Sequence, residues 1–93
     1  MNRAECLDKA KSIVTGGRED SYGGPENSFK RIALLWTAYI EAKYGKGLSL
    51  TPSDVALMMA QLKMARLMVN PNHEDSLVDG AGYFACAAEC GGE

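Results

Sequence analysis

Residues 51–69, TPSDVALMMAQLKMARLMV, form the stretch on which the fold of this chain depends. Its first residues favour the start of a helix: Thr51 as the N-cap, Pro52 at the first helical position and Asp54 near the positive end of the helix dipole. Asn70 precedes Pro71 and therefore disfavours the helical conformation, which ends the segment. The sequence predicts one continuous helix over this stretch.

This helix is apolar on two sides, whereas a helix on the outside of a small domain needs a single apolar stripe. Its main apolar face carries Val55, Met58, Met59, Leu62, Ala65 and Val69. The opposite face carries Leu57, Met64 and Met68. We therefore expect either a central helix or one that also meets a second subunit, with these three residues as the contact in a homo-oligomer. Arg66 projects from the main face.

The length and composition are those of one soluble globular domain. The 93 residues suffice for a single modest core, and they are 46% hydrophobic and 24% charged. A net charge of −2, without a basic stripe, does not favour binding to nucleic acid. No apolar run approaches the roughly 20 residues that span a bilayer, and the charged N-terminus lacks the apolar core of a secretion signal. We expect a cytoplasmic protein that does not bind membranes.

The three cysteines agree with a cytoplasmic setting, because an odd number without a secretion signal is typical of reduced thiols. Cys86 and Cys90 lie four residues apart, which does not readily satisfy the dihedral angles of a disulfide on one helix. With His73 they lack any recognisable zinc-ligand spacing. We expect buried structural thiols.

Three further segments have helical patterns: residues 3–15, residues 26–44 with a start between 26 and 28, and residues 73–90. The second of them has an apolar stripe expected in the core, formed by Phe29, Ile32, Ala33, Trp36, Tyr39 and Ile40. The last has an apolar face formed by Leu77, Val78, Ala81, Phe84, Ala85 and Ala88. Because small residues dominate this last helix, another backbone can approach it closely.

No strand pattern or internal repeat is present in the sequence. The short Asn70-Pro71 turn makes the third and fourth helices antiparallel neighbours. The sequence therefore predicts a single all-α domain over residues 1–93, a compact bundle of four helices in which the last two form an antiparallel hairpin.

Residues 16–25, GGREDSYGGP, form the most chemically varied loop of the chain. Its glycines permit backbone conformations that other residues avoid and let a backbone approach a ligand closely. Binding residues concentrate on loops, so Arg18 and Tyr22 are candidate ligand-binding residues. A plain polar connector is the alternative interpretation.

Asp75 and Asp79 are spaced by four residues, so both carboxylates lie on one side of the last helix. Lys63 and Arg66 lie across the turn and would relieve their mutual repulsion. In one interpretation Arg66 and Asp79 form a partly buried ion pair that sets the register of the two helices. In the other, the aspartates hold Mg²⁺, because this ion needs only one or two carboxylates together with phosphate oxygens and water.

The second interpretation assigns further residues to a ligand. Lys63, Arg66 and Arg18 would receive phosphate oxygens, and Tyr22 or Tyr83 would stack on a base. The site would then take a nucleotide or another phosphate compound, with Mg²⁺ as its only cofactor.

Three segments of the sequence resemble a family of small phage and prophage proteins without an established function. They are REDSYGGPENSF at residues 18–29, VALMMxxLKMAR at residues 55–66 and NPxHEDSLVDGAGY at residues 70–83. The resemblance covers nearly the whole chain from about residue 18 onward. It implies a phage-encoded or prophage-encoded protein that acts in the bacterial cytoplasm.

The ending KxxR…DxxxDxxxY is also similar to the C-terminal part of MazG-like all-α nucleoside triphosphate pyrophosphohydrolases. That resemblance implies a Mg²⁺ site at Asp75 and Asp79, with Lys63 near the phosphates. The first acidic motif of those enzymes, two glutamates three apart on an earlier helix, is absent. The only glutamate of residues 26–44 that is not beside the loop is Glu41. The resemblance therefore favours a binding descendant over a hydrolase.

Two functions remain open at this point. The first is nucleotide or phosphate binding, extending to Mg²⁺-dependent pyrophosphohydrolysis. The second is a non-enzymatic helical interaction protein that associates with itself or with a host protein, which the doubly apolar helix and the five methionines favour.

Overall fold

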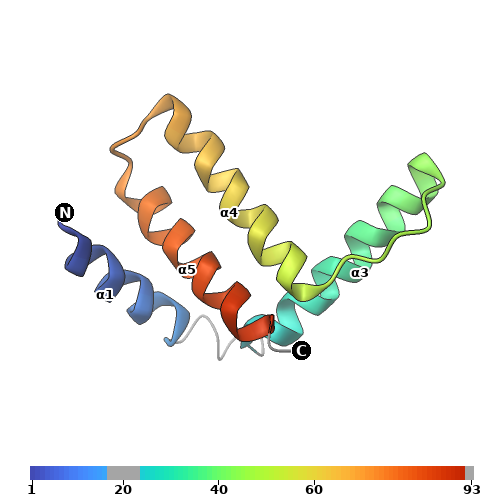
Figure 1. The fold of residues 1–93 in the computed structure, drawn as a ribbon, viewed down its shortest axis with the longest axis horizontal. Helices are drawn as coiled ribbons and strands as arrows, with labels where there is room; N and C mark the ends of the chain where they lie inside the picture. The colour runs from blue at the N-terminus through green and yellow to red at the C-terminus, as the bar shows by residue number, and fades with distance from the viewer. Residues whose placement is uncertain (17–23, 92–93) are drawn as a thin grey trace.

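The computed structural model describes residues 1–16 and 24–91, which contain four α-helices and no strand. The helices are α1 (Arg3–Val14), α3 (Gly24–Tyr44), α4 (Pro52–Val69) and α5 (Glu74–Cys90). Figure 1 shows α4 and α5 side by side, with α1 along α5 and α3 crossing near the start of α4. The predicted all-α fold of four helices is confirmed.

The predicted start of α4 is confirmed and its cap forms, whereas α3 begins at Gly24, before the predicted start between residues 26 and 28. At the start of α4, Thr51 Oγ1 accepts from the Asp54 backbone N–H at 3.1 Å, and Asp54 Oδ2 accepts from the Thr51 backbone N–H at 2.9 Å. At the start of α5, His73 Nδ1 accepts from the Ser76 backbone N–H at 3.3 Å. These reciprocal bonds satisfy backbone donors that a helix N-terminus otherwise leaves free.

The α4–α5 pair is the most extensive helix packing in the described part of the chain, and it is the predicted antiparallel hairpin. Small residues of α5 bring its neighbours close. A Cβ added at Gly80 would lie 4.0 Å from Lys63 Cβ on α4, and one added at Gly82 would lie 3.1 Å from Val14 Cγ1 on α1. The expected close approach of another backbone to α5 therefore occurs on two sides.

The core lies where α3, α4 and α5 meet. Its buried residues come from all three helices: Phe29, Ala33, Val55, Ala56, Cys86 and Cys90. Partly buried side chains surround them, including Ile32, Trp36, Leu50 and Met59. The prediction that Cys86 and Cys90 are buried is confirmed.

The predicted core face of α4 is wrong for most of its members. Val55 is buried and Met59 is partly buried, but Met58, Leu62, Ala65 and Val69 are exposed. Burial instead continues through Ala56 and Ala60. The reason is that small side chains allow α5 to pack closely on the alanine side of α4, which rotates the buried face away from the larger residues.

The predicted apolar face of α5 is wrong in the same way. Val78 is buried, but Leu77 and Phe84 are exposed, while Gly82 and Cys86 on the small-residue face are buried. Close packing against α1 and α4 therefore determines which side of α5 is inside. The size of its side chains does not determine which side of α5 is buried.

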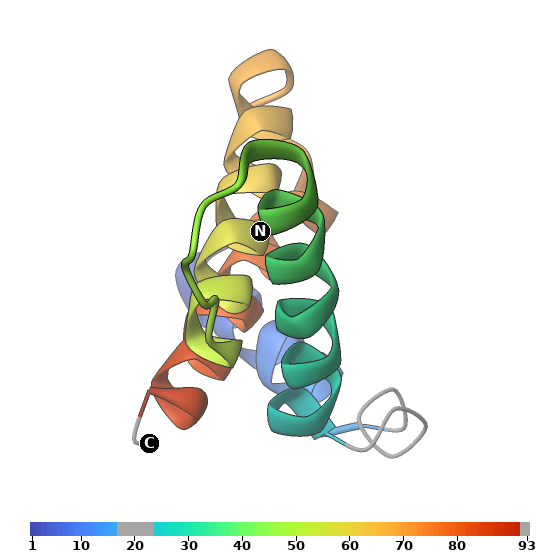
Figure 2. The same ribbon diagram turned by 90° about the vertical axis from the view of Figure 1, so that its right-hand side faces the viewer.

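The second half of α3 extends away from the hairpin as an arm (Figure 1). Figure 2 shows residues 45–51 running back along this arm to the start of α4, where the Leu50 backbone N–H donates to Thr37 Oγ1 at 2.9 Å. Tyr39, predicted in the core, is exposed on the arm together with Leu34 and Leu35. The radius of gyration, 14.3 Å, exceeds the value of about 12 Å expected for a domain of this length.

Candidate functional site

The charged cluster predicted between α4 and α5 contains one close ion pair. Lys63 Nζ lies 2.9 Å from Asp79 Oδ2, and the two side chains are 11% and 23% exposed. The Lys63–Asp79 pair is more buried than the pair of Lys9 and Glu74 at 3.5 Å, in which both side chains are about half exposed. The Lys63–Asp79 pair joins the two helices of the hairpin directly.

The local sequence explains why Lys63 makes this contact. Its stem passes Gly80 of α5, where an added Cβ would lie 4.0 Å from Lys63 Cβ, an ordinary contact distance. Asp79 precedes that glycine and is half buried, so its carboxylate stands beside the ammonium group. The long side chain of Lys63 on α4 therefore contacts α5 where Gly80 follows Asp79.

Arg66 and Asp75 do not join this pair. Both residues are exposed, and neither side chain forms an ion pair within residues 1–16 and 24–91. The expectation that Arg66 pairs with Asp79 or Asp75 is therefore wrong. Arg66 follows Lys63 by three residues, so its side chain is rotated by about 60° about the helix axis relative to that of Lys63. This rotation carries Arg66 away from α5.

The metal prediction concerned Asp75 and Asp79. Across the described residues, no group of three or more histidine, cysteine or acidic side chains is placed to hold a metal ion. Two carboxylates with phosphate oxygens would suffice for Mg²⁺. Asp79, however, already has the Lys63 ammonium at contact distance. Mg²⁺ binding by the two aspartates stays a prediction.

The aromatic and loop residues assigned to a ligand have different positions. Tyr83 is partly buried against the core and packs on Phe29, with ring centroids 6.2 Å apart and planes inclined by 40°. Its ring therefore already has an aromatic neighbour inside the protein. Arg18 and Tyr22 lie outside the described residues.

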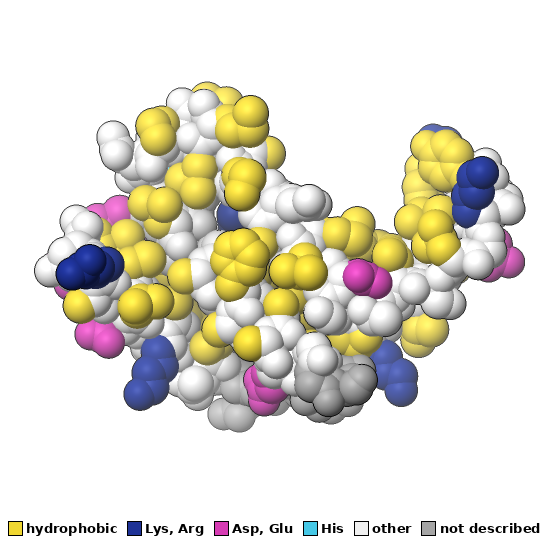
Figure 3. All heavy atoms as spheres, viewed as in Figure 1, with side chains coloured by type: hydrophobic (Ala, Val, Ile, Leu, Met, Phe, Trp, Pro, Cys, Tyr) yellow, Lys and Arg dark blue, Asp and Glu magenta, His cyan; other side chains and the backbone are white. Residues whose placement is uncertain are grey.

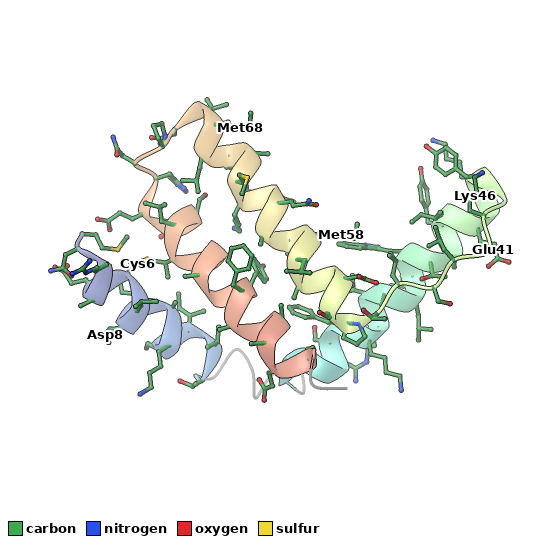
Figure 4. The ribbon with its side chains drawn as sticks, viewed as in Figure 1. Cys6, Asp8, Glu41, Lys46, Met58 and Met68 are labelled. Carbon is green, nitrogen blue, oxygen red and sulfur yellow. The ribbon has the colours of Figure 1, made fainter. Side chains whose placement is uncertain are left out.

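A different surface stands out once the side chains are placed. Five large apolar residues on the outer side of the hairpin are exposed, and we call them the hairpin face: Leu57, Met64 and Met68 of α4 with Leu77 and Phe84 of α5. Hydrophobic side chains gather over α4 and α5 on the face shown in Figure 3, and Met68 extends from α4 in Figure 4.

Sequence reasoning identified the α4 half of the hairpin face and missed the α5 half. Leu77 and Phe84 were placed on the apolar face predicted for their helix. The signal that could have separated them is the run Gly82, Cys86 and Cys90, which marks the opposite side as the one that packs closely.

A family model described as a domain of unknown function, DUF6378, matches residues 5–91. The gene 55 protein of Mycobacterium phage L5 is 46% identical over 77 residues, which are 83% of this chain and 46% of that protein. The gene 55 protein of Mycobacterium phage D29 is 38% identical over 80 residues, which are 86% of this chain and 49% of that protein. The chain thus spans about half the length of these curated relatives.

No solved structure matches this chain. Within the described part of the chain, none of the helices has the length and hydropathy required to cross a bilayer. The predicted resemblance to a phage protein family without an established function is confirmed by the family match and by the two phage relatives.

Proposed function

The chain belongs to the DUF6378 family of phage-type proteins, and we propose that it is a non-enzymatic interaction protein that works by contact of its exposed helix faces with protein. The observation that carries this proposal is the exposure of large apolar side chains on the hairpin face, where Met68 is 82% exposed. Monomeric soluble proteins rarely leave contiguous apolar patches of this kind uncovered.

A second apolar surface supports the same proposal. Along the arm of α3, Leu34, Leu35, Tyr39 and Tyr44 are each exposed by more than half. Glu41 and Lys46 mark the far end of this arm in Figure 4. Aromatic and aliphatic side chains presented on a rigid helix are common anchors of protein interfaces.

The charged cluster favours a scaffold role. Lys63 and Asp79 neutralise each other at contact distance between two packed helices. A pair of this kind fixes the register of the helices and leaves fewer free groups for a ligand. Relatives encoded by phages lead us to assign the protein to the cytoplasm of an infected bacterium.

Binding of a nucleotide or other phosphate compound is the second candidate, either as a binding domain or as a Mg²⁺-dependent pyrophosphohydrolase of the MazG-like type. The observation that favours it is the position of Asp75, exposed one turn before Asp79, with Lys63 beside the latter. In this function the two aspartates bind Mg²⁺, while Lys63, Arg66 and Arg18 bind phosphate oxygens. Tyr22 would stack on the base in place of the packed Tyr83.

Thermal unfolding in the presence of ligands separates the two candidates. We expect the melting temperature to stay constant when deoxynucleoside triphosphates and Mg²⁺ are added together, because the interaction protein has no site for them. A rise that disappears in both Asp75→Asn and Asp79→Asn would contradict the proposal and support the phosphate site. Each variant is compared with and without ligand, so that its own change in stability does not enter the comparison.

A further inference from the structure

We infer that the hairpin face binds a second copy of this chain, so that two α4–α5 hairpins stack into a four-helix interface with two-fold symmetry. The inference rests on the proposed function and goes further by naming the partner of one surface. It also adds two α5 residues, Leu77 and Phe84, to the contact that the sequence placed on α4 alone.

The hairpin face lies on the side of the hairpin that the other helices leave uncovered. The core lies on the side where α3 contributes Phe29 and Ala33, and α1 packs through Val14 against Gly82. Neither contact involves the positions of Met64, Met68 or Phe84, which stay exposed.

The face is uncharged as well as apolar. Residues spaced by four share one side of a helix, which places Gln61 next to Leu57, and Gly80 and Ala88 on either side of Phe84. These positions carry no charge that would attract an oppositely charged partner. We therefore expect the hairpin face to bind another uncharged pair of helices of similar length. A second copy of this chain has such a pair in its own hairpin face.

The amount of exposed surface agrees with one missing protomer contact. The chain exposes 6436 Å², whereas a folded monomer of 10.0 kDa ordinarily exposes about 5,200 Å². The excess of about 1,200 Å² compares with about 800 Å² that each partner buries in a stable interface of standard size. The diverging arm of α3 (Figure 1) contributes to this excess as well as the hairpin face, and a contact of standard size on the hairpin face would remove about 800 Å² of it.

The shape of the face suits a self-complementary contact. In an interface with two-fold symmetry the same patch meets itself, so each projection needs a hollow elsewhere on that patch. Phe84 projects between Gly80 and Ala88, which lack large side chains. Met64 and Met68 are unbranched and adapt to irregular gaps. Large and small residues therefore alternate as such a contact requires.

The molar mass in solution tests the inference, measured by sedimentation equilibrium at tens of micromolar. We expect twice the 10.0 kDa of one chain for the unchanged protein. Met64→Lys should raise the dissociation constant by roughly tenfold or more, because symmetry buries two new ammonium groups in an apolar contact. The matched control is Leu7→Lys, which places the same charge at a similarly exposed apolar position on α1, outside both proposed surfaces, and should leave the dimer intact.

A wild-type chain that stays monomeric overturns the inference, and so does a dimer that Met64→Lys leaves unchanged or that Leu7→Lys weakens equally. Circular dichroism verifies that each variant keeps its helix content, and Met68→Lys replaces Met64→Lys if the latter unfolds. A monomer without any nucleotide response overturns the dimer and leaves the proposed function standing. A nucleotide response of the kind described above contradicts the proposed function whatever the mass.

Discussion

Lys63 and the two glycines of α5 hold the hairpin and its neighbours in position. Lys63 passes Gly80 and reaches Asp79, and Val14 of α1 packs closely on Gly82. These contacts involve few atoms, yet they decide which residues of α5 face inward. Substitutions at these positions therefore test the packing directly.

Asp79→Asn should destabilise the fold, whereas Asp75→Asn should not. Loss of the Asp79 charge leaves the Lys63 ammonium without its partner in a partly buried position. The expected cost is roughly 1–3 kcal/mol, between the values for exposed and for fully buried pairs. Urea unfolding of both variants measures it. Equal stability of the two variants would contradict a structural role for the Lys63–Asp79 pair.

Gly80→Ala should stabilise the protein and Gly82→Ala should not. Alanine favours a helix over glycine by about 1 kcal/mol, and a Cβ at position 80 makes only an ordinary contact of 4.0 Å. At position 82 the new Cβ would lie 3.1 Å from Val14 Cγ1, so the Val14 side chain must give way and the gain is offset. Melting temperatures should therefore rank Gly80→Ala above Gly82→Ala. The reverse order would show that α1 does not pack closely on α5.

The helix α4 is the element that connects the rest, since α5 packs on one side of it and α3 on another. Its start is set by the reciprocal bonds of Thr51 and Asp54, directly after the segment that returns along the arm. Its outward side contributes to the hairpin face. One helix thus contributes both to the core and to the surface proposed for association.

Thr51→Ala should weaken the start of α4 by about 1 kcal/mol, the usual effect of removing an N-cap side chain. Thr51→Ser keeps the oxygen that accepts from the Asp54 N–H, so it should stay close to the unchanged protein. Chemical unfolding of the pair gives the difference. A Ser variant as unstable as the Ala variant would mean that the threonine methyl group, and not its hydroxyl, stabilises this helix start.

The whole molecule is open for its size, because the arm of α3 diverges from the hairpin and the hairpin face is exposed (Figures 1 and 3). A chain of 93 residues has a small core. The proposed association would add buried apolar area that the single chain does not supply, and it would therefore link stability to protein concentration.

The melting temperature should consequently rise with protein concentration. Mass action favours the folded dimer when only the folded chain associates. Scanning calorimetry over a 100-fold range of concentration, about the range that such mass-action linkage requires, should show an upward shift for the unchanged protein and none for Met64→Lys. A melting temperature independent of concentration in both would contradict a dimer that is coupled to folding.

Much of the fold follows from local sequence. The cap at Thr51 and the Asn70-Pro71 turn predicted the start and the end of α4 and the antiparallel hairpin, and these agree with the structure. Such signals act over three or four residues, so they do not depend on what packs against the helix.

The candidate site could be predicted from the sequence less well than the fold. Lys63 and Asp79 were placed in the right neighbourhood, but the pairing of Arg66 was wrong and the α5 half of the hairpin face was missed. Both errors come from the rotation of a helix about its own axis. In α4 and α5 apolar residues occur all around the helix, so periodicity alone leaves that rotation open.

The sequence by itself therefore determined that the chain is helical, where its helices begin and end, and which two are antiparallel neighbours. Only the tertiary structure decided which side of each helix is buried. The physical reason is that contacts with residues of another helix, such as Val14 against Gly82, set the buried side, and the periodicity of one helix does not contain them. That choice leaves Leu57, Met64, Met68, Leu77 and Phe84 on the outside.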